Sequence, residues 1–257
     1  MKNKVVQILK ENSINNVGFC DFDVVKAQLL DYRAKLRLPQ NPQTVIMCAF
    51  PYKAKNEPPK MLSRYAALPD YHNICGDMLK TASIALKKEY PQNKFEYFCD
   101  NSPIPEVLAA ATAGLGVKGD NGLLITQKYG SYVFLGEIVT DLHIESESKY
   151  SECEHCGKCK TACPVTLDKQ NCLSNLSQQK KLTDCELETL QKNNILWGCD
   201  ICAAACPHNK TAQNTDIAQF INGYRDAYLP DEDPTDRPYT WRGTEPIKRN
   251  YKNLVCK

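Results

Sequence analysis

The cysteines of this chain have the spacing of iron–sulfur ligands. From Cys153 to Pro164 the sequence reads C-x2-C-x2-C-x3-C-P, and from Cys199 to Pro207 it reads C-x2-C-x3-C-P. The first run has the spacing of bacterial ferredoxins, in which the fourth cysteine ligates the other cluster. Two such half-motifs predict two 4Fe–4S clusters. We assign one to Cys153, Cys156, Cys159 and Cys206, and the other to Cys163, Cys172, Cys199 and Cys202.

Structural zinc and disulfides are the alternatives for these cysteines. Zinc sites commonly pair two CxxC knuckles and close on four ligands, so a run of three cysteines followed by Cys-Pro favours iron–sulfur clusters. His155 and His208 lie in the cluster loops, where we expect them to tune the clusters by hydrogen bonding, because eight thiolates already suffice. We interpret Cys185 as a spare thiol. The remaining cysteines form no framework: Cys20, Cys48, Cys75, Cys99 and Cys256.

The composition predicts a globular chain in a reducing compartment. The formal net charge of the 257 residues is +2, too small to indicate nucleic acid by itself. The first residues, MKNKVVQILKENS, predict an amphipathic helix rather than a signal peptide. No apolar run approaches the length that spans a bilayer. We therefore expect a cytoplasmic monomer with no membrane partner.

Basic residues collect near the end of the chain. Between Arg237 and Lys257 there are six basic residues and one acidic residue, Glu245. A solvated tail and a surface that contacts phosphates both explain this excess. The sequence leaves the two interpretations open.

Hydrophobic periodicity predicts an α/β domain ahead of the cysteines. We expect helices at 2–12, Val24 to Leu36 and 73–89, and strands at Val17 to Cys20 and Lys94 to Cys99. The run TVIMCAF, Thr44 to Phe50, predicts a strand covered on both faces. Leu123 to Thr126 and Tyr132 to Val139 predict an antiparallel pair.

A further helix is predicted directly after Asp100, which follows a strand. Ser102 is a candidate N-cap, Pro103 suits the first turn, and Glu106 would face the positive end of the helix dipole. The alanines of VLAAATA let this helix lie close to a strand or to a flat cofactor. Asp100 by itself is better explained as a cap or turn residue than as a catalytic acid.

Several of these strings together resemble the epoxyqueuosine reductase family. They are RYA (64–66), DYH (70–72), Asp100 with Pro103 and Glu106, AGLG (113–116), Gly119, Asn121 and GSYVFLGEIVTDL (130–142). The cysteine module, GCDICAAACPHN (198–209) and the segment from Trp241 to Asn250 also match. The resemblance covers about residues 2–250. The combination is more specific than the cysteine module, which many redox proteins share.

The resemblance implies an α+β fold in three parts. Residues 1–145 would form a nitroreductase-related cobalamin-binding α/β domain, and 146–210 a two-cluster bacterial-ferredoxin-like module. Residues 211–257 would be a basic tail that packs on the core.

The resemblance also implies an activity, which is reduction of epoxyqueuosine to queuosine in tRNA. Electrons would come from an external donor such as a flavodoxin or a ferredoxin. Asp100 would be the proton donor. The cobalamin contacts would be Arg64, Tyr65, Tyr71, His72, Pro103, Glu106, Gly114, Gly116, Gly119 and Asn121.

The chain departs from the family pattern near these positions. Val117 and Asp120 stand where the family usually has tryptophan and lysine, and Val107 stands where it usually has arginine. A cobalamin and iron–sulfur reductase of another substrate, such as a reductive dehalogenase, is therefore one alternative. A plain electron-transfer ferredoxin with an adaptor domain is another, and it would not need Asp100.

Overall fold

The computed structural model describes residues 1–146, 149–231 and 234–255, so Cys256 lies outside the described residues. The chain forms two compact units. The first comprises Met1–Pro51 and Tyr71–His155, and the second comprises Tyr52–Asp70 and Cys156–Lys257. Residues 52–70 thus pack with the later part of the chain, although the sequence placed them within the first 145 residues.

The first unit is built on a four-stranded antiparallel sheet. Its strands lie in the order β1 (Val17–Asp21), β2 (Thr44–Pro51), β6 (Val133–Thr140) and β3 (Phe95–Phe98). Every residue of β2 is buried, which confirms the strand predicted from TVIMCAF. The two long central strands are in register from Thr44 opposite Thr140 to Pro51 opposite Val133.

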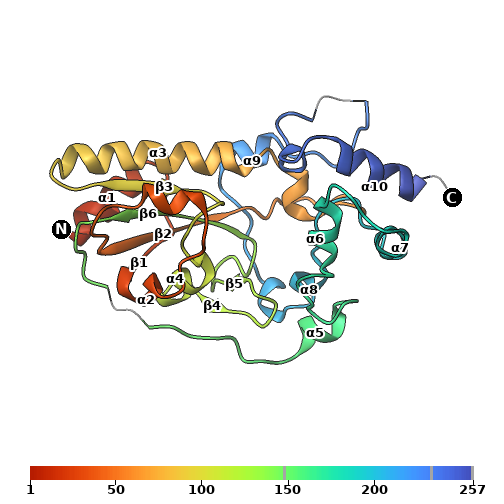
Figure 1. The fold of residues 1–257 in the computed structure, drawn as a ribbon, viewed down its shortest axis with the longest axis horizontal. Coiled ribbons are helices and arrows are strands. Elements are labelled where there is room, and N and C mark those ends of the chain that lie inside the picture. Colours follow the sequence, from red (N-terminus) through yellow and green to blue (C-terminus); the bar gives the residue numbers. More distant parts are fainter. Residues whose placement is uncertain (147–148, 232–233, 256–257) are drawn as a thin grey trace. The chain divides into compact units, whose positions relative to one another are not determined.

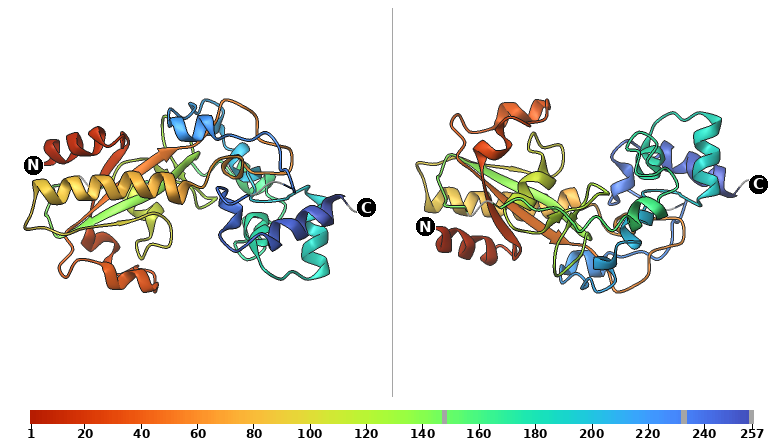
Figure 2. Two further views of the ribbon diagram at one scale, coloured as in Figure 1. Left: turned by 90° about the horizontal axis from the view of Figure 1, so that it is seen from above. Right: turned by 90° about the horizontal axis from the view of Figure 1, so that it is seen from below.

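Helices cover both faces of this sheet (Figures 1 and 2). On one face α3 (Tyr71–Glu89) packs against β3 and β6 and also contacts α1 (Lys2–Glu11). On the other face α4 (Glu106–Thr112) packs against β1, β2 and β6, next to α2 (Phe22–Lys26). A Cβ on Gly18 would lie 2.4 Å from the carbonyl oxygen of Ala113. Only glycine therefore lets the end of α4 approach β1 so closely.

Three sequence predictions for this unit were wrong in detail. The helix expected from Val24 to Leu36 is instead the short α2 and a separate 3-10 turn, Arg33–Arg37. Helix α4 starts at Glu106 with Pro105 at its N-cap position, and no side chain caps it. The strand β5 (Leu124–Ile125) pairs with β4 (Val117–Lys118), whereas its expected partner β6 lies between β2 and β3.

The glycines that follow α4 explain why β5 pairs with β4 rather than with β6. Gly114 has a φ of 77° and turns the chain out of the helix. A Cβ on Gly116 would lie 2.3 Å from the carbonyl oxygen of Ile125. The chain therefore turns back at once and forms its own small hairpin.

The second unit consists of short helices around two small apolar clusters. One cluster contains Trp197, Leu196, Tyr239 and Ile247, and the other contains Leu173, Leu176 and Leu190. The helices are α5 (Lys158–Ala162), α6 (Leu173–Gln178), α7 (Asp184–Lys192), α8 (Ile201–Ala204), α9 (Ala218–Asn222) and α10 (Glu245–Val255). Among the described residues, no helix combines the length and the apolar character needed to cross a membrane.

Hydrogen bonds from polar side chains hold α10 in place within this unit. The Asn250 amide donates to the carbonyl oxygens of Ser177 and Leu196, and the Arg249 guanidinium donates to those of Gln179 and Lys180. Asn250 is fully buried. These bonds satisfy carbonyl groups at the end of α6, so Arg249 has a structural role in the basic segment.

Candidate functional site

Asp100 lies in a tight turn directly after β3. Asp100 and Asn101 have φ angles of 57° and 46°, in the left-handed region. This conformation is uncommon for residues with a side chain and is best tolerated by Asn and Asp. Oδ1 of Asp100 accepts a hydrogen bond from the backbone N–H of Asn101 at 2.8 Å. The turn therefore presents the other carboxylate oxygen to the start of α3.

The first two residues of α3 bind that oxygen. The hydroxyl of Tyr71 donates to Oδ2 of Asp100 at 3.1 Å, and Nε2 of His72 lies 3.1 Å from the same atom. The Tyr71 ring stacks on the rings of His72 and Phe134, each with a centroid distance of 4.1 Å. The structure thus brings together three residues that the sequence analysis had placed at the site.

A pocket of about 330 Å³ opens beside this group. Arg37, His72, Lys80, Asp100 and Asn101 are among the residues that line it, and 57% of the Asp100 side chain is exposed. A carboxylate and an imidazole on the pocket wall, with the Tyr71 phenol bonded to the carboxylate, can exchange protons with a bound group.

The pKa of Asp100 is lowered, chiefly because His72 hydrogen-bonds to the carboxylate. Partial burial acts in the opposite direction, and the bonds from Asn101 and Tyr71 lower the pKa further. In this arrangement Asp100 is the ionised partner that holds His72 and Tyr71.

Two further carboxyl groups, Glu106 and Glu137, lie near the segment that follows Asp100, and Glu137 was not predicted as a site residue. Glu106 is in the first turn of α4, as predicted. Glu137 lies in the central strand β6, where it is fully buried and accepts a hydrogen bond from the hydroxyl of Ser102. The signal that could have found Glu137 is a charged residue inside the apolar run VFLGEIV.

The cysteine half-motifs are paired in the second unit. Helix α5, which contains Cys159, packs against α8, which contains Cys202. Each helix is followed by the Cys-Pro of its motif, Cys163 or Cys206. The 13 cysteines among the described residues are all free thiols, so disulfides do not account for the spacing.

Charge repulsion acts within this cysteine group. The pKa of the Cys199 thiol is raised to about 12, first by burial and then by Cys202, Asp200 and Cys172. Thiolates gathered in this way are stable only when a cation compensates their charge, and a coordinated metal does so. Cys172, Cys199 and Cys202, three of the four cysteines assigned to one cluster, thus lie near enough for their charges to interact.

Cys153 belongs to the first unit. Its backbone N–H donates to the carbonyl oxygen of Lys118 on β4 at 3.0 Å. Ligand atoms of Asp120, Cys153 and His155 lie within 4.8 Å of one another, and Nδ1 of His155 is 2.7 Å from Oδ1 of Asp120. Asp120, one of the departures from the family pattern, thus binds a histidine of the cluster loop.

Arg64 and Tyr65 lie in the second unit and support the segment before Cys199. The backbone N–H of Arg64 donates to Oδ2 of Asp200 at 2.6 Å, and its guanidinium pairs with Glu57 at 2.8 Å. The Tyr65 hydroxyl accepts from the amide of Gln178 at 3.4 Å. A Cβ on Gly198 would lie 2.1 Å from the hydroxyl oxygen of Ser63, so this segment needs glycine there.

The remaining residues that were predicted to contact cobalamin have structural roles in the chain. Gly114, Gly116, Gly119 and Asn121 shape the β4–β5 hairpin, where Gly119 N–H donates to Leu123 O at 2.8 Å. Pro103 is buried, and its carbonyl accepts from Leu30 N–H at 2.8 Å. The alanines of α4 are fully buried against the sheet. The sequence left open whether these alanines pack against a strand or against a flat cofactor, and in the structure they pack against strands of the sheet.

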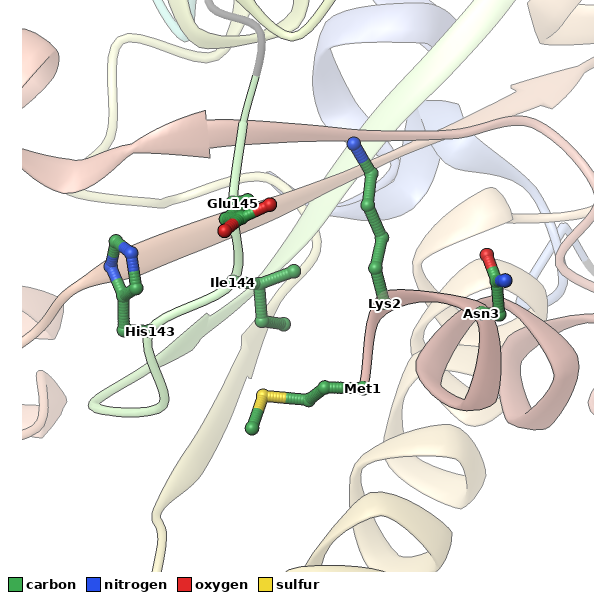
Figure 3. Close-up of a pocket in the computed structure, with 6 residues that line it drawn as sticks. All are labelled: Met1, Lys2, Asn3, His143, Ile144 and Glu145. Carbon is green, nitrogen blue, oxygen red and sulfur yellow. The ribbon is translucent and has the colours of Figure 1, made fainter.

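A second pocket, of about 450 Å³, lies at the start of α1 (Figure 3). Met1, Lys2 and Asn3 form one side of it, and His143, Ile144 and Glu145 form the other. None of the predicted site residues lines this pocket, and we assign no role to it.

Comparison with known proteins gives consistent matches along the chain. The family model described as epoxyqueuosine reductase QueG, DUF1730, matches residues 33–101. The epoxyqueuosine reductase of Lactococcus garvieae is 28% identical over 97% of this chain and 85% of the relative. That of Synechocystis is 37% identical over 62% of this chain and 58% of the relative.

Solved structures have the same fold. The structure of epoxyqueuosine reductase from Streptococcus thermophilus superposes with a TM-score of 0.80 at 24% identity, over 99% of this chain and 80% of that one. A crystal structure of epoxyqueuosine reductase with a tRNA-Tyr epoxyqueuosine-modified stem loop gives a TM-score of 0.80 at 23% identity, over the same shares of the two chains. The fold is therefore a mixed α/β fold of the epoxyqueuosine reductase type. The chain is thus similar to epoxyqueuosine reductases along nearly its whole length.

Proposed function

We propose that this protein reduces epoxyqueuosine to queuosine in tRNA. The observation that carries the proposal is the group of Asp100, His72 and Tyr71 at an open pocket, in a chain similar to epoxyqueuosine reductases. A ferredoxin that only transfers electrons would not need such a group. The departures at Val107, Val117 and Asp120 keep reduction of another substrate as the alternative.

The residues present fit two 4Fe–4S clusters. The ligands would be Cys153, Cys156, Cys159 and Cys206 for one cluster, and Cys163, Cys172, Cys199 and Cys202 for the other. The free thiols and the paired helices α5 and α8 support this assignment. When bound, the clusters would supply electrons one at a time from an external donor such as a flavodoxin or ferredoxin.

Cobalamin is the second cofactor of the proposal, and its fit is more limited. The alanines of α4 are taken up by the sheet, so they offer no flat surface for a corrin. Polar groups of Asp100, Asn101 and His72 around the pocket can bond amide side chains. When bound, cobalamin would supply a strongly reducing centre for the epoxide. Arg64, Tyr65 and the β4–β5 hairpin remain proposed contacts.

We assign the proposed functions to three consecutive segments of the chain. Residues 1–145 would be the nitroreductase-related cobalamin domain, 146–210 the ferredoxin-like module, and 211–257 the basic tail. We propose a cytoplasmic monomer that receives its electrons from a separate protein.

Residues of the chain would supply the protons that the reaction consumes. Removing an epoxide oxygen as water breaks two C–O bonds and consumes two electrons and two protons. His72 and Tyr71 carry protons at Oδ2 of Asp100, where the carboxylate orients both donors. A proton delivered there protonates the departing oxygen before bulk water reaches it.

The exposed lysines of α10 are expected to contact tRNA phosphates. Lys248 and Lys252 are exposed and four residues apart, so they share a face of the helix. Replacing both by Gln should weaken tRNA binding and reduce the slope of log K against log salt by about 2. The measurement is a filter-binding or anisotropy titration at several salt concentrations.

Lys4 and Lys10, which are exposed on α1, provide the matched control pair. Their replacement by Gln should leave the slope nearly unchanged. Arg249 is left intact because it bonds backbone carbonyls. Equal slopes for wild type and the Lys248/Lys252 variant would show that the tail is only solvated.

The proposed function itself is tested by supplying the reconstituted chain with tRNA that carries epoxyqueuosine. Conversion to queuosine is the expected result.

A further inference from the structure

Glu137 occupies a position where a carboxyl group is costly. It lies opposite Phe98 on β3 and Met47 on β2, and none of its surface is exposed. Alternation along the strand puts it on the same face as Val139, within the apolar cluster that includes Ile104 and the alanines of α4. A charged carboxylate there needs a compensating group.

The compensating group is a second carboxyl rather than a cation. Oε1 of Glu137 accepts from the Ser102 hydroxyl, whose oxygen in turn accepts from Ile104 N–H at 3.0 Å. Oε2 of Glu137 and Oε1 of Glu106 are buried and receive no other donor from the described residues. The two carboxyl groups hydrogen-bond to each other. Such a bond requires a proton, because two carboxylates contain none to donate.

The charges around the pair keep this proton in place. Asp100, in the turn after β3, acts on Glu106, and Cys99 acts on Glu137. Glu137 in turn raises the pKa of Cys48 on β2. Among the described residues, no Lys, Arg or His contributes to the pKa of either carboxyl. Every neighbour that acts through its charge therefore opposes ionisation.

The two members of the pair have different roles. Burial, followed by the charge of Glu106, raises the pKa of Glu137 well above its usual value. Burial and then the charge of Asp100 raise the pKa of Glu106 to about 8, whereas the hydrogen bond from Glu137 lowers it. Glu137 is fully buried, whereas Glu106 at the start of α4 is partly exposed, so Glu106 is the member of the pair that can exchange a proton with its surroundings.

We propose that the Glu106–Glu137 pair is a proton reserve for the Asp100 site, in which Glu106 gives up the proton and Glu137 is a positioning residue. The inference rests on the proposed function. Of the two protons consumed per epoxide, the group of Asp100, His72 and Tyr71 gives the first, and Glu106 gives the second. The second proton converts the oxygen that leaves into water. Ionised Glu106 then accepts the hydrogen bond from Glu137 and regains a proton from solvent.

The test combines infrared spectroscopy with a pH profile of turnover on the full, reconstituted chain. Wild type should show a buried carboxylic C=O band at neutral pH that weakens with a midpoint near pH 8 and is missing in Glu106→Gln. Turnover of wild type should fall along the same curve. In Glu106→Gln it should be lower by roughly 10²-fold, without this alkaline limb. Glu89→Gln, at an exposed position on α3, is the control and should match wild type.

Variants of Glu137 separate positioning from simple packing. In Glu137→Gln the amide still donates to Glu106 and accepts from Ser102, so the alkaline limb should stay close to that of wild type. Glu137→Leu removes the donor, so both the infrared midpoint and the limb should move to higher pH. If wild type converts the substrate and Glu106→Gln shows the same alkaline limb as wild type, the proton reserve alone is overturned. A loaded wild type that does not convert epoxyqueuosine overturns the proposed function.

Discussion

Replacement of Asp100 by Asn is expected to lower turnover by at least about 10²-fold while both clusters and the cobalamin remain bound. The amide has nearly the same shape as the carboxylate, but it cannot hold Tyr71 and His72 as the ionised Asp100 does. Asn also tolerates the left-handed φ of 57° at this position, so the turn is preserved. The measurement is single-turnover conversion of the tRNA substrate at matched iron content.

Two companion variants identify which member of the group delivers the proton. His72→Gln can still hydrogen-bond to Oδ2 but cannot transfer a proton, and it should lose nearly as much turnover as Asp100→Asn. Glu89→Gln changes an exposed carboxylate at the end of α3 that does not line the pocket, and it should retain full turnover. Near-normal turnover in loaded Asp100→Asn would contradict the role given to Asp100.

Replacement of Cys206 by Ala is expected to reduce bound iron from about eight to about four atoms per chain. Cys206 is buried and follows α8, but the exchange of fourth ligands assigns it to the cluster of Cys153, Cys156 and Cys159. Iron and acid-labile sulfide analysis after anaerobic reconstitution provides the measurement. Cys185→Ala, which changes an exposed thiol outside both ligand sets, should retain all of the iron.

Double variants test the ligand assignment itself, because losses within one cluster do not add. Adding Cys156→Ala to Cys206→Ala should cost no further iron, since both residues serve the same cluster. Adding Cys199→Ala should remove nearly all of it. The opposite pattern would assign Cys206 to the cluster of Cys199 and Cys202.

The sequence was most informative where a local pattern determines the structure. Residues Thr44–Pro51 form the buried strand that an apolar run between prolines predicts. The two cysteine half-motifs, recognised from their spacing, each contain a short helix, and these helices pack together. In both cases the signal is contained within a few neighbouring residues.

The site itself depends on contacts between distant segments. Asp100 meets Tyr71 and His72 from another element, and Glu106 meets Glu137 from a strand later in the chain. The pKa of Asp100 illustrates the limit, because hydrogen bonds that no spacing shows outweigh the effect of burial, which by itself raises the pKa.

The most direct test of the central claim is the fate of epoxyqueuosine in tRNA. The chain, reconstituted anaerobically with iron, sulfide and cobalamin and given a reductant, is incubated with tRNA from cells that accumulate epoxyqueuosine. The nucleosides are then quantified by mass spectrometry. We predict that queuosine appears as epoxyqueuosine disappears, and that Asp100→Asn slows this conversion. If fully loaded wild-type protein leaves epoxyqueuosine unchanged under these conditions, the proposed function is contradicted.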